Sequence, residues 1–143
     1  AGEKVMPGSK VQITVSNGIP ESNTAELKVT LEAAMKMGYN TVWAVFQPFT
    51  FSRTALLKDE FIKALSIADK VILTPIMGSR EINTYGISSE DIAQKLNCAV
   101  CVENFDEVVE AIEKLAENGD IVITMGGGDI YKAAYKYREL KNK

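Results

Sequence analysis

The sequence contains no histidine, and this absence excludes several kinds of active site within the chain. Ser-His-Asp and Cys-His arrangements need an imidazole base, and most protein zinc sites need imidazole ligands. Cysteine is scarce as well, with only Cys98 and Cys101. The stretch 99–102 favours a strand, on which residues i and i+3 point to opposite faces. We therefore interpret the two cysteines as small core residues, with a redox or metal-binding pair as the alternative.

Long apolar runs and a large excess of one charge are also missing. The longest apolar stretches, such as 71–73 and 99–102, are far too short to span a membrane, and residues 1–10 lack the apolar core of a signal peptide. The formal net charge is −3 over 143 residues, which gives no sign of nucleic-acid binding. We expect a cytoplasmic protein that has neither a membrane nor a nucleic acid as its partner.

What the sequence does have is a regular alternation of short apolar runs and amphipathic segments. The runs predict strands at 11–15, 41–46, 70–73, 99–102 and 121–124, with helices between them and after the last one. This order is typical of an α/β protein with short loops and a parallel sheet. We predict a three-layer α/β/α, Rossmann-like domain over 11–143, with a mostly parallel sheet of about five to six strands. We expect residues 1–10 to be a linker or a disordered start.

Four helix starts carry capping signals, and the first is Asn23 with Glu26, which stands at capping-box spacing for a helix that ends at Gly38. Ser52 is expected to cap a helix over 53–68, whose apolar stripe consists of Leu56, Leu57, Phe61, Ala64 and Leu65. Ser88 with Asp91, and Asn104 with Glu107, stand at capping-box spacing for two later helices.

A glycine cluster follows the last predicted strand. Gly126, Gly127 and Gly128 come directly after it and precede Asp129 and a helical pattern from Ile130. Such a turn lets backbone N–H groups approach an anion, because no Cβ intervenes and the first N–H groups of a helix have no internal partner. A tight turn without a ligand is the alternative. Ligands of parallel α/β sheets bind at the carboxyl ends of the strands, so we expect the loops after Val15, Phe46, Leu73 and Thr124 to form any site.

Several short segments together resemble a known family. They are Glu26–Leu31, Phe46–Pro48, Ser52–Thr54, Asp59–Phe61, Ala68–Leu73, Ser88–Asp91, Glu103–Asp106 and Thr124–Tyr131. In this order and spacing they resemble the C-terminal domain of the Mur ligases, most closely the ligases that join UDP-N-acetylmuramic acid to L-alanine. The resemblance extends from about Val11 to Leu140.

The resemblance implies an ATP-dependent amide-bond reaction of peptidoglycan precursor synthesis, with Mg²⁺, in a three-domain enzyme. The central domain of that enzyme carries the P-loop, and this chain has no Gly-Lys-Ser/Thr sequence. We therefore expect a third domain that is inactive alone and has no cofactor, metal site or catalytic residue of its own. The ligand-binding positions that match the family are Arg53, Arg80, Met125, Gly126, Gly127, Gly128 and Asp129.

The differences from the family cluster in the strand-end loops. The family has a run resembling Asp-Asp-Tyr-x-His-His-Pro-Thr-Glu where this chain has Gly18–Glu26, and Gln-Pro-His where it has Gln47–Phe49. After the third strand, Pro75–Glu81 lacks the Asp and the Tyr of the family pattern. The altered rim consists of Ile19, Pro20, Phe49, Phe51, Pro75 and Met77, and it is more apolar than the family's.

We interpret this clustering as a remodelled site, since drift would also change the helices. An engineered variant is our hypothesis, and a divergent natural relative is the alternative. A remodelled apolar rim predicts a non-enzymatic binding module for a small molecule or a protein, and it makes a homodimer a further expectation.

Overall fold

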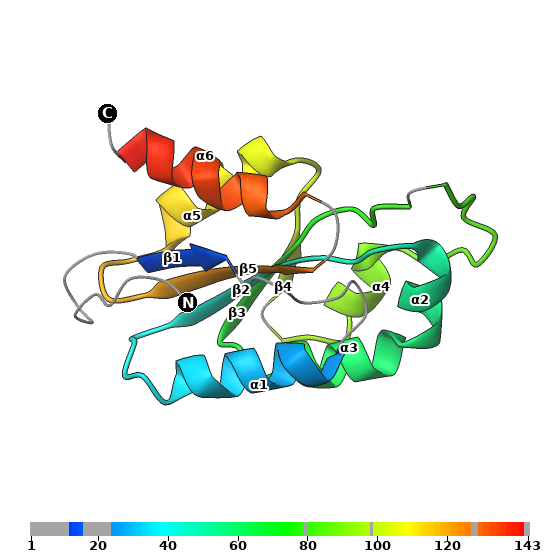
Figure 1. The fold of residues 1–143 in the computed structure, drawn as a ribbon, viewed down its shortest axis with the longest axis horizontal. Helices are drawn as coiled ribbons and strands as arrows, with labels where there is room; N and C mark the ends of the chain where they lie inside the picture. Colours follow the sequence, from blue (N-terminus) through cyan, green and yellow to red (C-terminus); the bar gives the residue numbers. More distant parts are fainter. Residues whose placement is uncertain (1–11, 16–23, 79, 98, 127–128, 142–143) are drawn as a thin grey trace.

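A computed structural model describes residues 12–15 (backbone only), 24–78, 80–97, 99–126 and 129–141 (Figure 1). The strands are β1 (Gln12–Val15), β2 (Val42–Gln47), β3 (Lys70–Leu73), β4 (Ala99–Cys101) and β5 (Ile121–Gly126). The helices are α1 (Thr24–Met35), α2 (Phe51–Leu56), α3 (Lys58–Leu65), α4 (Ser89–Ala93), α5 (Phe105–Leu115) and α6 (Tyr131–Lys141).

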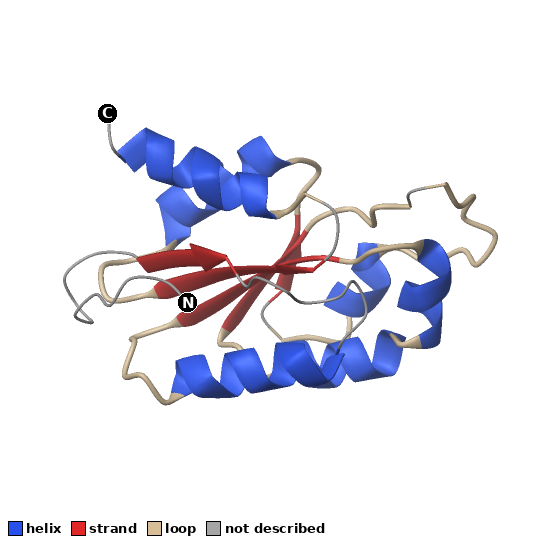
Figure 2. Ribbon diagram, in the orientation of Figure 1, coloured by secondary structure: helices blue, strands red, loops and turns tan. Residues whose placement is uncertain are grey.

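The five strands form one sheet in the order β1-β5-β2-β3-β4, and every neighbouring pair is parallel. Helices lie on both faces of this sheet (Figure 2), so the predicted three-layer α/β fold is confirmed. β2 lies in the middle of the sheet, and all its residues are buried. This explains its continuous apolar sequence, because a central parallel strand is covered on both faces. Residues 1–10 lie outside the described part, and their assignment as a linker stays a prediction.

Two apolar clusters fill the space between the layers. The first joins one sheet face to α1, α3 and α4 through residues such as Leu31, Phe61 and Ile92. The second joins the other face to α5 and α6 through residues such as Ile112 and Tyr137. Alternate residues of a strand serve alternate clusters, as the period of two requires. In the described residues no helix is long and apolar enough to cross a bilayer.

The single helix predicted over 53–68 is wrong. The segment is divided into α2 and α3, which meet at Leu57, whose backbone is not helical (φ −105°, ψ 14°). The break shifts the rotational phase of α2, so Leu56 is 81% exposed instead of lying in the apolar stripe. The N-cap is Thr50 and not Ser52, because α2 begins earlier, at Phe51.

The predicted caps of α4 and α5 are confirmed, whereas the predicted cap Asn23 lies outside the described residues. The Ser88 N–H donates to the Asp91 carboxylate at 2.8 Å at the start of α4. The Asn104 side chain accepts from the Glu107 N–H at 2.9 Å at the start of α5. Both caps are local in sequence, which is why the spacing alone predicted them.

The interpretation of both cysteines as core residues is wrong for Cys101, which is exposed. It lies on β4, a three-residue strand at the edge of the sheet that the helices do not cover fully. Desolvation of the sulfur and the nearby Glu90 and Glu103 carboxylates raise the pKa of the Cys101 thiol. A raised pKa disfavours the reactive thiolate form of the side chain. Cys98 lies outside the described residues.

Candidate functional site

The carboxyl ends of β2, β3 and β5 meet at one edge of the sheet, on the side of α2 and of the loop that follows β3 (Figure 1). Gln47, the last residue of β2, is paired with Gly126, the last residue of β5. On its other side the Thr74 N–H donates to the carbonyl of Phe46 at 3.1 Å, which extends the contact between β2 and β3. Gln47 therefore lies between Gly126 and Thr74 at the centre of this edge.

Polar atoms are buried at this edge without hydrogen-bond partners among the described residues. They are Gln47 Oε1, Thr74 Oγ1 and Asp129 Oδ1. Val45 and Ile72, two residues before Gln47 and Thr74, belong to the cluster under α5 and α6. Strand alternation therefore places the Gln47 and Thr74 side chains on that same face. Most buried polar atoms in proteins are paired, so this edge contains more buried polar atoms than the hydrogen bonds of the described residues satisfy.

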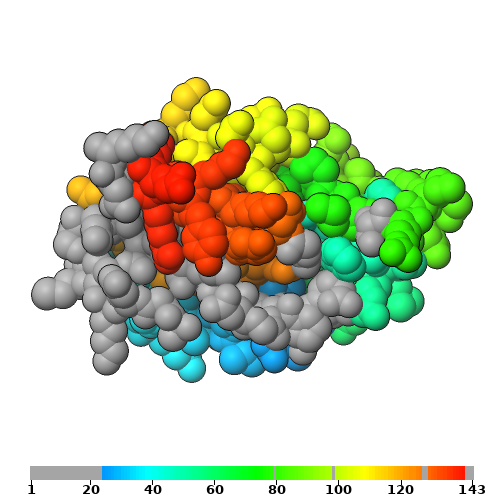
Figure 3. Space-filling view, turned by 45° about the horizontal axis from the view of Figure 1, so that its top comes forward, coloured from blue at the N-terminus to red at the C-terminus, as the bar shows by residue number. Residues whose placement is uncertain are grey.

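Two loops that are distant in sequence are joined by backbone contacts at this edge. The Thr50 N–H donates to the Met77 carbonyl at 2.8 Å, and the Met77 N–H donates to the Pro48 carbonyl at 2.9 Å. These bonds form an isolated parallel bridge between Phe49 and Met77. The atoms of the two loops, teal and green, gather at one end of the molecule (Figure 3).

Thr50 has a strained backbone in this junction. Its φ is +62° and its ψ is 145°, a region that β-branched residues rarely adopt and that costs about 1–3 kcal/mol. Its carbonyl accepts from the Thr54 hydroxyl at 2.7 Å, and its own hydroxyl accepts from the Arg53 N–H at 3.4 Å. Strain of this kind is concentrated at functional sites.

Glu81 crosses from the second loop to the start of α2. One carboxylate oxygen accepts from the Ser52 N–H at 2.9 Å, and the other accepts from the Ser52 hydroxyl at 2.6 Å. The two Ser52 bonds, first that of the hydroxyl, lower the pKa of the Glu81 carboxyl, and the positive charge of Arg53 adds to this effect. The carboxylate is therefore ionised at neutral pH and caps α2 from outside the helix.

The described residues of the altered rim have different environments. Phe49, Phe51 and Met77 are half-buried, whereas Pro75 is exposed. The Phe51 ring packs against Gly78 so closely that a Cβ at that glycine would overlap it. Ile19 and Pro20 lie outside the described residues. That this rim is engineered, or that it binds a partner, stays a prediction.

The two arginines that match the family lie on the joined loops. Arg53 is in the first turn of α2, Arg80 is in the loop between β3 and α4, and both side chains are exposed. The structure thus brings two loops with cationic side chains together at the carboxyl edge of a parallel sheet. This arrangement suits a phosphate or a carboxylate, because a guanidinium pairs well with either group.

The residues that match the family at the end of β5 are placed differently. Met125 is buried in the cluster under α1 and α3, so only its backbone lies near the edge. Gly126 has φ +116°, and a Cβ there would overlap the Gln47 carbonyl, so only glycine fits. Asp129 is half-buried, and its Oδ2 lies 3.6 Å from Lys132 Nζ. Gly127 and Gly128 are outside the described residues, and anion binding by this turn stays a prediction.

Sequence reasoning missed the contact between Ser52 and Glu81 and the strain at Thr50. The two residues of that contact are 29 positions apart, and nothing in either local sequence points to the other. Gln47 had a visible signal, because a polar residue directly ends the apolar run 41–46. Its burial without a partner for Oε1 depends on the neighbouring strands and could not be predicted from that run.

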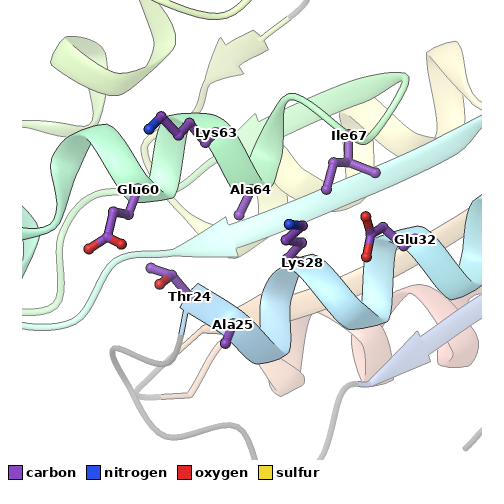
Figure 4. A pocket seen from close by; sticks show the side chains of 8 residues that line it. All are labelled: Thr24, Ala25, Lys28, Glu32, Glu60, Lys63, Ala64 and Ile67. Carbon is purple, nitrogen blue, oxygen red and sulfur yellow. The ribbon is translucent and has the colours of Figure 1, made fainter.

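A hollow lies in the groove between α1 and α3 (Figure 4). Its volume is about 460 Å³, and the residues that line it are Thr24, Ala25, Lys28, Glu32, Glu60, Lys63, Ala64 and Ile67. It contains none of the predicted site residues. Its charged side chains are of both signs, which does not favour a ligand of one charge.

Comparison with known proteins identifies relatives over most of the chain. The family described as Mur ligase, glutamate ligase domain, matches residues 22–128. A UDP-N-acetylmuramate–L-alanine ligase from Lachnospira eligens is 48% identical over 111 residues, which are 75% of this chain and 24% of that enzyme. One from Acetivibrio thermocellus is 43% identical over 123 residues, 83% of this chain and 26% of that enzyme. The chain thus spans about a quarter of the length of the curated relatives it matches.

Solved structures show the same fold. A UDP-N-acetylmuramate–alanine ligase from Thermotoga maritima has a TM-score of 0.67 at 22% identity, covering 91% of this chain and 27% of that one. A single domain of a UDP-N-acetylmuramate:L-alanyl-γ-D-glutamyl-diaminopimelate ligase from Haemophilus ducreyi has a TM-score of 0.65 at 20% identity, covering 96% of this chain and 98% of that one. The predicted resemblance is confirmed: this chain belongs to the Mur ligase family, as a domain that resembles the C-terminal domain of the UDP-N-acetylmuramate–L-alanine ligases.

Proposed function

We propose that this chain acts as the third domain of a ligase that joins UDP-N-acetylmuramate to L-alanine. The observation that carries the proposal is the meeting of the two arginine-bearing loops at the carboxyl edge of the sheet. Ligands of parallel α/β sheets bind at that edge. The substrates in this proposal are inferred from the names of the relatives, and the dependence on ATP is inferred from membership of the family.

Arg53 has the central role in this proposal. It lies in the first turn of α2 and is exposed at the edge. Its guanidinium would contact a phosphate of the nucleotide, the acyl-phosphate or the carboxylate of the amino acid. Such charge-assisted, bidentate contacts are about twice as strong as neutral hydrogen bonds, and they fix orientation.

The rest of the enzyme would supply the remaining parts of the reaction. The chain has no P-loop sequence, and the described residues hold no group of three or more acidic or cysteine side chains that could bind a metal ion. We therefore assign Mg²⁺ and most nucleotide contacts to the segments that the relatives have in addition. On this view the chain does not turn over alone, and it works in the cytoplasm, where its substrates are made.

A chimeric enzyme tests the proposal. The part of the Lachnospira eligens ligase that aligns with this chain is replaced by this chain, and phosphate release that depends on ATP and L-alanine is measured. We expect an active chimera. In it Arg53→Ala lowers kcat/KM by about 100-fold, and Arg53→Lys lowers it less, because the charge is kept but the bidentate contact is lost.

The matched control is Arg138→Ala, an exposed arginine near the end of α6. It removes the same charge on a helix that runs away from the edge, and we expect less than about a twofold change. A folded chimera without activity, or one in which Arg53→Ala changes no more than Arg138→Ala, would contradict the proposal.

A binding module is the second candidate function, and specific side chains favour it. Leu56 and Ile82 are 81% and 82% exposed, and both lie in the segments that carry the half-buried Phe49, Phe51 and Met77. Exposed aliphatic side chains of this size mark contact surfaces when they gather. The same chimera decides between the candidates, because a rim remodelled for another ligand predicts no ligase activity.

A further inference from the structure

The short helix α2 cannot set its own orientation. It has six residues, and isolated helices shorter than about 12–15 residues are marginal in water. Its direction therefore depends on the contacts of its first turn with the rest of the molecule. Because Arg53 lies in that turn, the place of its guanidinium depends on the same contacts.

The strongest contact of that turn comes from Glu81. Both of its carboxylate oxygens are engaged by Ser52, at 2.9 Å from the N–H and 2.6 Å from the hydroxyl. The Ser52 N–H is one of the first groups of α2, which have no partner within the helix. The helix's own cap is weaker, because the Thr50 hydroxyl accepts from the Arg53 N–H at the longer distance of 3.4 Å. The shorter and charge-assisted bonds are therefore supplied by the other loop.

Glu81 adds to the other contacts that hold this first turn. The bridge between Phe49 and Met77 and the packing of Phe51 on Gly78 bring the two loops together. The backbone pairing at Phe49 comes before the helix, and the strained Thr50 lies between that pairing and the first turn of α2. The pairing alone therefore does not fix how the first turn is rotated. A contact at two atoms of one residue fixes both position and rotation.

We infer that Glu81 is a positioning residue for Arg53: by holding Ser52 at two points it fixes the first turn of α2, so that the Arg53 guanidinium meets the phosphate or carboxylate of the substrate. The inference rests on the proposed function for the role of Arg53. Glu81 acts through its two bonds to Ser52 and through the direct attraction between its carboxylate and the Arg53 charge, and it touches no reacting atom.

The chimera measures this connection as a double-mutant cycle. With Arg53 present, Glu81→Ala lowers kcat/KM by about tenfold; in the Arg53→Ala background the same change lowers it by less than about twofold, because the residue it positions is gone. Glu81→Gln gives an intermediate loss, since its amide oxygen still accepts from the Ser52 N–H. The control Glu139→Ala, an exposed acid on α6, leaves kcat/KM unchanged. An equal loss from Glu81→Ala in both backgrounds, or no loss in either, would overturn the inference.

A measurement on the chain alone keeps the two proposals separable. By NMR, Glu81→Ala is expected to shift the Arg53 Nε–Hε signal and to speed exchange of the Ser52 amide by about tenfold or more, since that amide loses its acceptor. Glu139→Ala is expected to do neither, and the thermal midpoints show that both variants are folded. An unchanged Arg53 signal in folded Glu81→Ala overturns the inference whatever the chimera does. A chimera insensitive to Arg53→Ala, with the Arg53 signal shifted as expected, contradicts the proposed function only.

Discussion

Two buried threonines on either side of the site show how differently one residue type can be used. Thr54 is fully buried, and its hydroxyl donates to the Thr50 carbonyl at 2.7 Å. Thr74 is 1% exposed, and its hydroxyl has no partner among the described residues. A buried polar group without a partner costs about 1–3 kcal/mol, whereas a paired one contributes about 1 kcal/mol. The sequence could not tell these two apart, because only the neighbouring chain segments decide the pairing.

Replacement of each hydroxyl by a methyl group tests this contrast. Thr74→Val is expected to raise the free energy of unfolding by about 1 kcal/mol, and Thr54→Val is expected to lower it by about the same amount. Urea unfolding followed by the fluorescence of the buried Trp43, the sole tryptophan of the sequence, measures both. If Thr74→Val destabilises the protein as Thr54→Val does, the Thr74 hydroxyl has a partner after all, such as a buried water.

At the scale of elements, prediction succeeded where the signal is local and failed where it is not. The caps of α4 and α5 are formed by residues three apart, and the spacing predicted them. The division of 53–68 into α2 and α3 was missed, because the helical pattern of the segment continues through Leu57. The contacts that begin α2 early, at Phe51, come from the distant loop that contains Met77 and Glu81.

The cap from Glu81 makes the stability of α2 depend on pH. The folded pKa of Glu81 is lowered from 4.5, chiefly by its bond from the Ser52 hydroxyl. A lowered folded pKa means that the stabilisation is fully present above the unfolded value and is lost as the pH falls below about 4.5 through the folded pKa. The melting temperature of the wild type should therefore exceed that of Glu81→Gln at neutral pH, and this difference should shrink below that pH.

Thermal unfolding followed by circular dichroism over about pH 3 to 7 measures this difference. Glu139→Gln, on the exposed face of α6, is the matched control and should show a small difference at every pH. A Glu81→Gln difference that is the same across the whole range would mean that the ionised carboxylate does not stabilise α2.

At the scale of the whole molecule, the fold is a sheet between two helical layers with the site at one edge. Arg53 and Arg80 are exposed on the two joined loops at that edge. The chain spans about a quarter of the length of its relatives, and under the proposed function this edge is one half of a site between domains, which alone would hold a ligand only weakly. The geometry therefore fits a domain that completes a site whose other half lies in a further domain.

The isolated chain is accordingly expected to release no phosphate from ATP, with or without L-alanine and Mg²⁺, at millimolar nucleotide. The physical reason is that no P-loop sequence is present to hold the phosphates and the metal ion. A phosphate-release assay on the purified chain measures this, with the active chimera as the positive control. If a phosphate-releasing activity co-elutes with the chain and is lost in Arg53→Ala, the domain is instead a catalyst on its own.

The sequence by itself determined the layers, the parallel sheet, the caps of α4 and α5 and the family. The layers, the sheet and these caps follow from apolar periodicity and from residues close together in the chain, and the family follows from the resemblance of several short motifs. Tertiary structure alone decided the break at Leu57, the exposure of Cys101, the strain at Thr50 and the bond between Ser52 and Glu81. The exposure of Cys101 depends on the place of β4 at the edge of the sheet, and the other three depend on how the segments around α2 pack. Packing brings together residues as far apart in the chain as Ser52 and Glu81, which are separated by 29 positions, a distance at which periodicity carries no information.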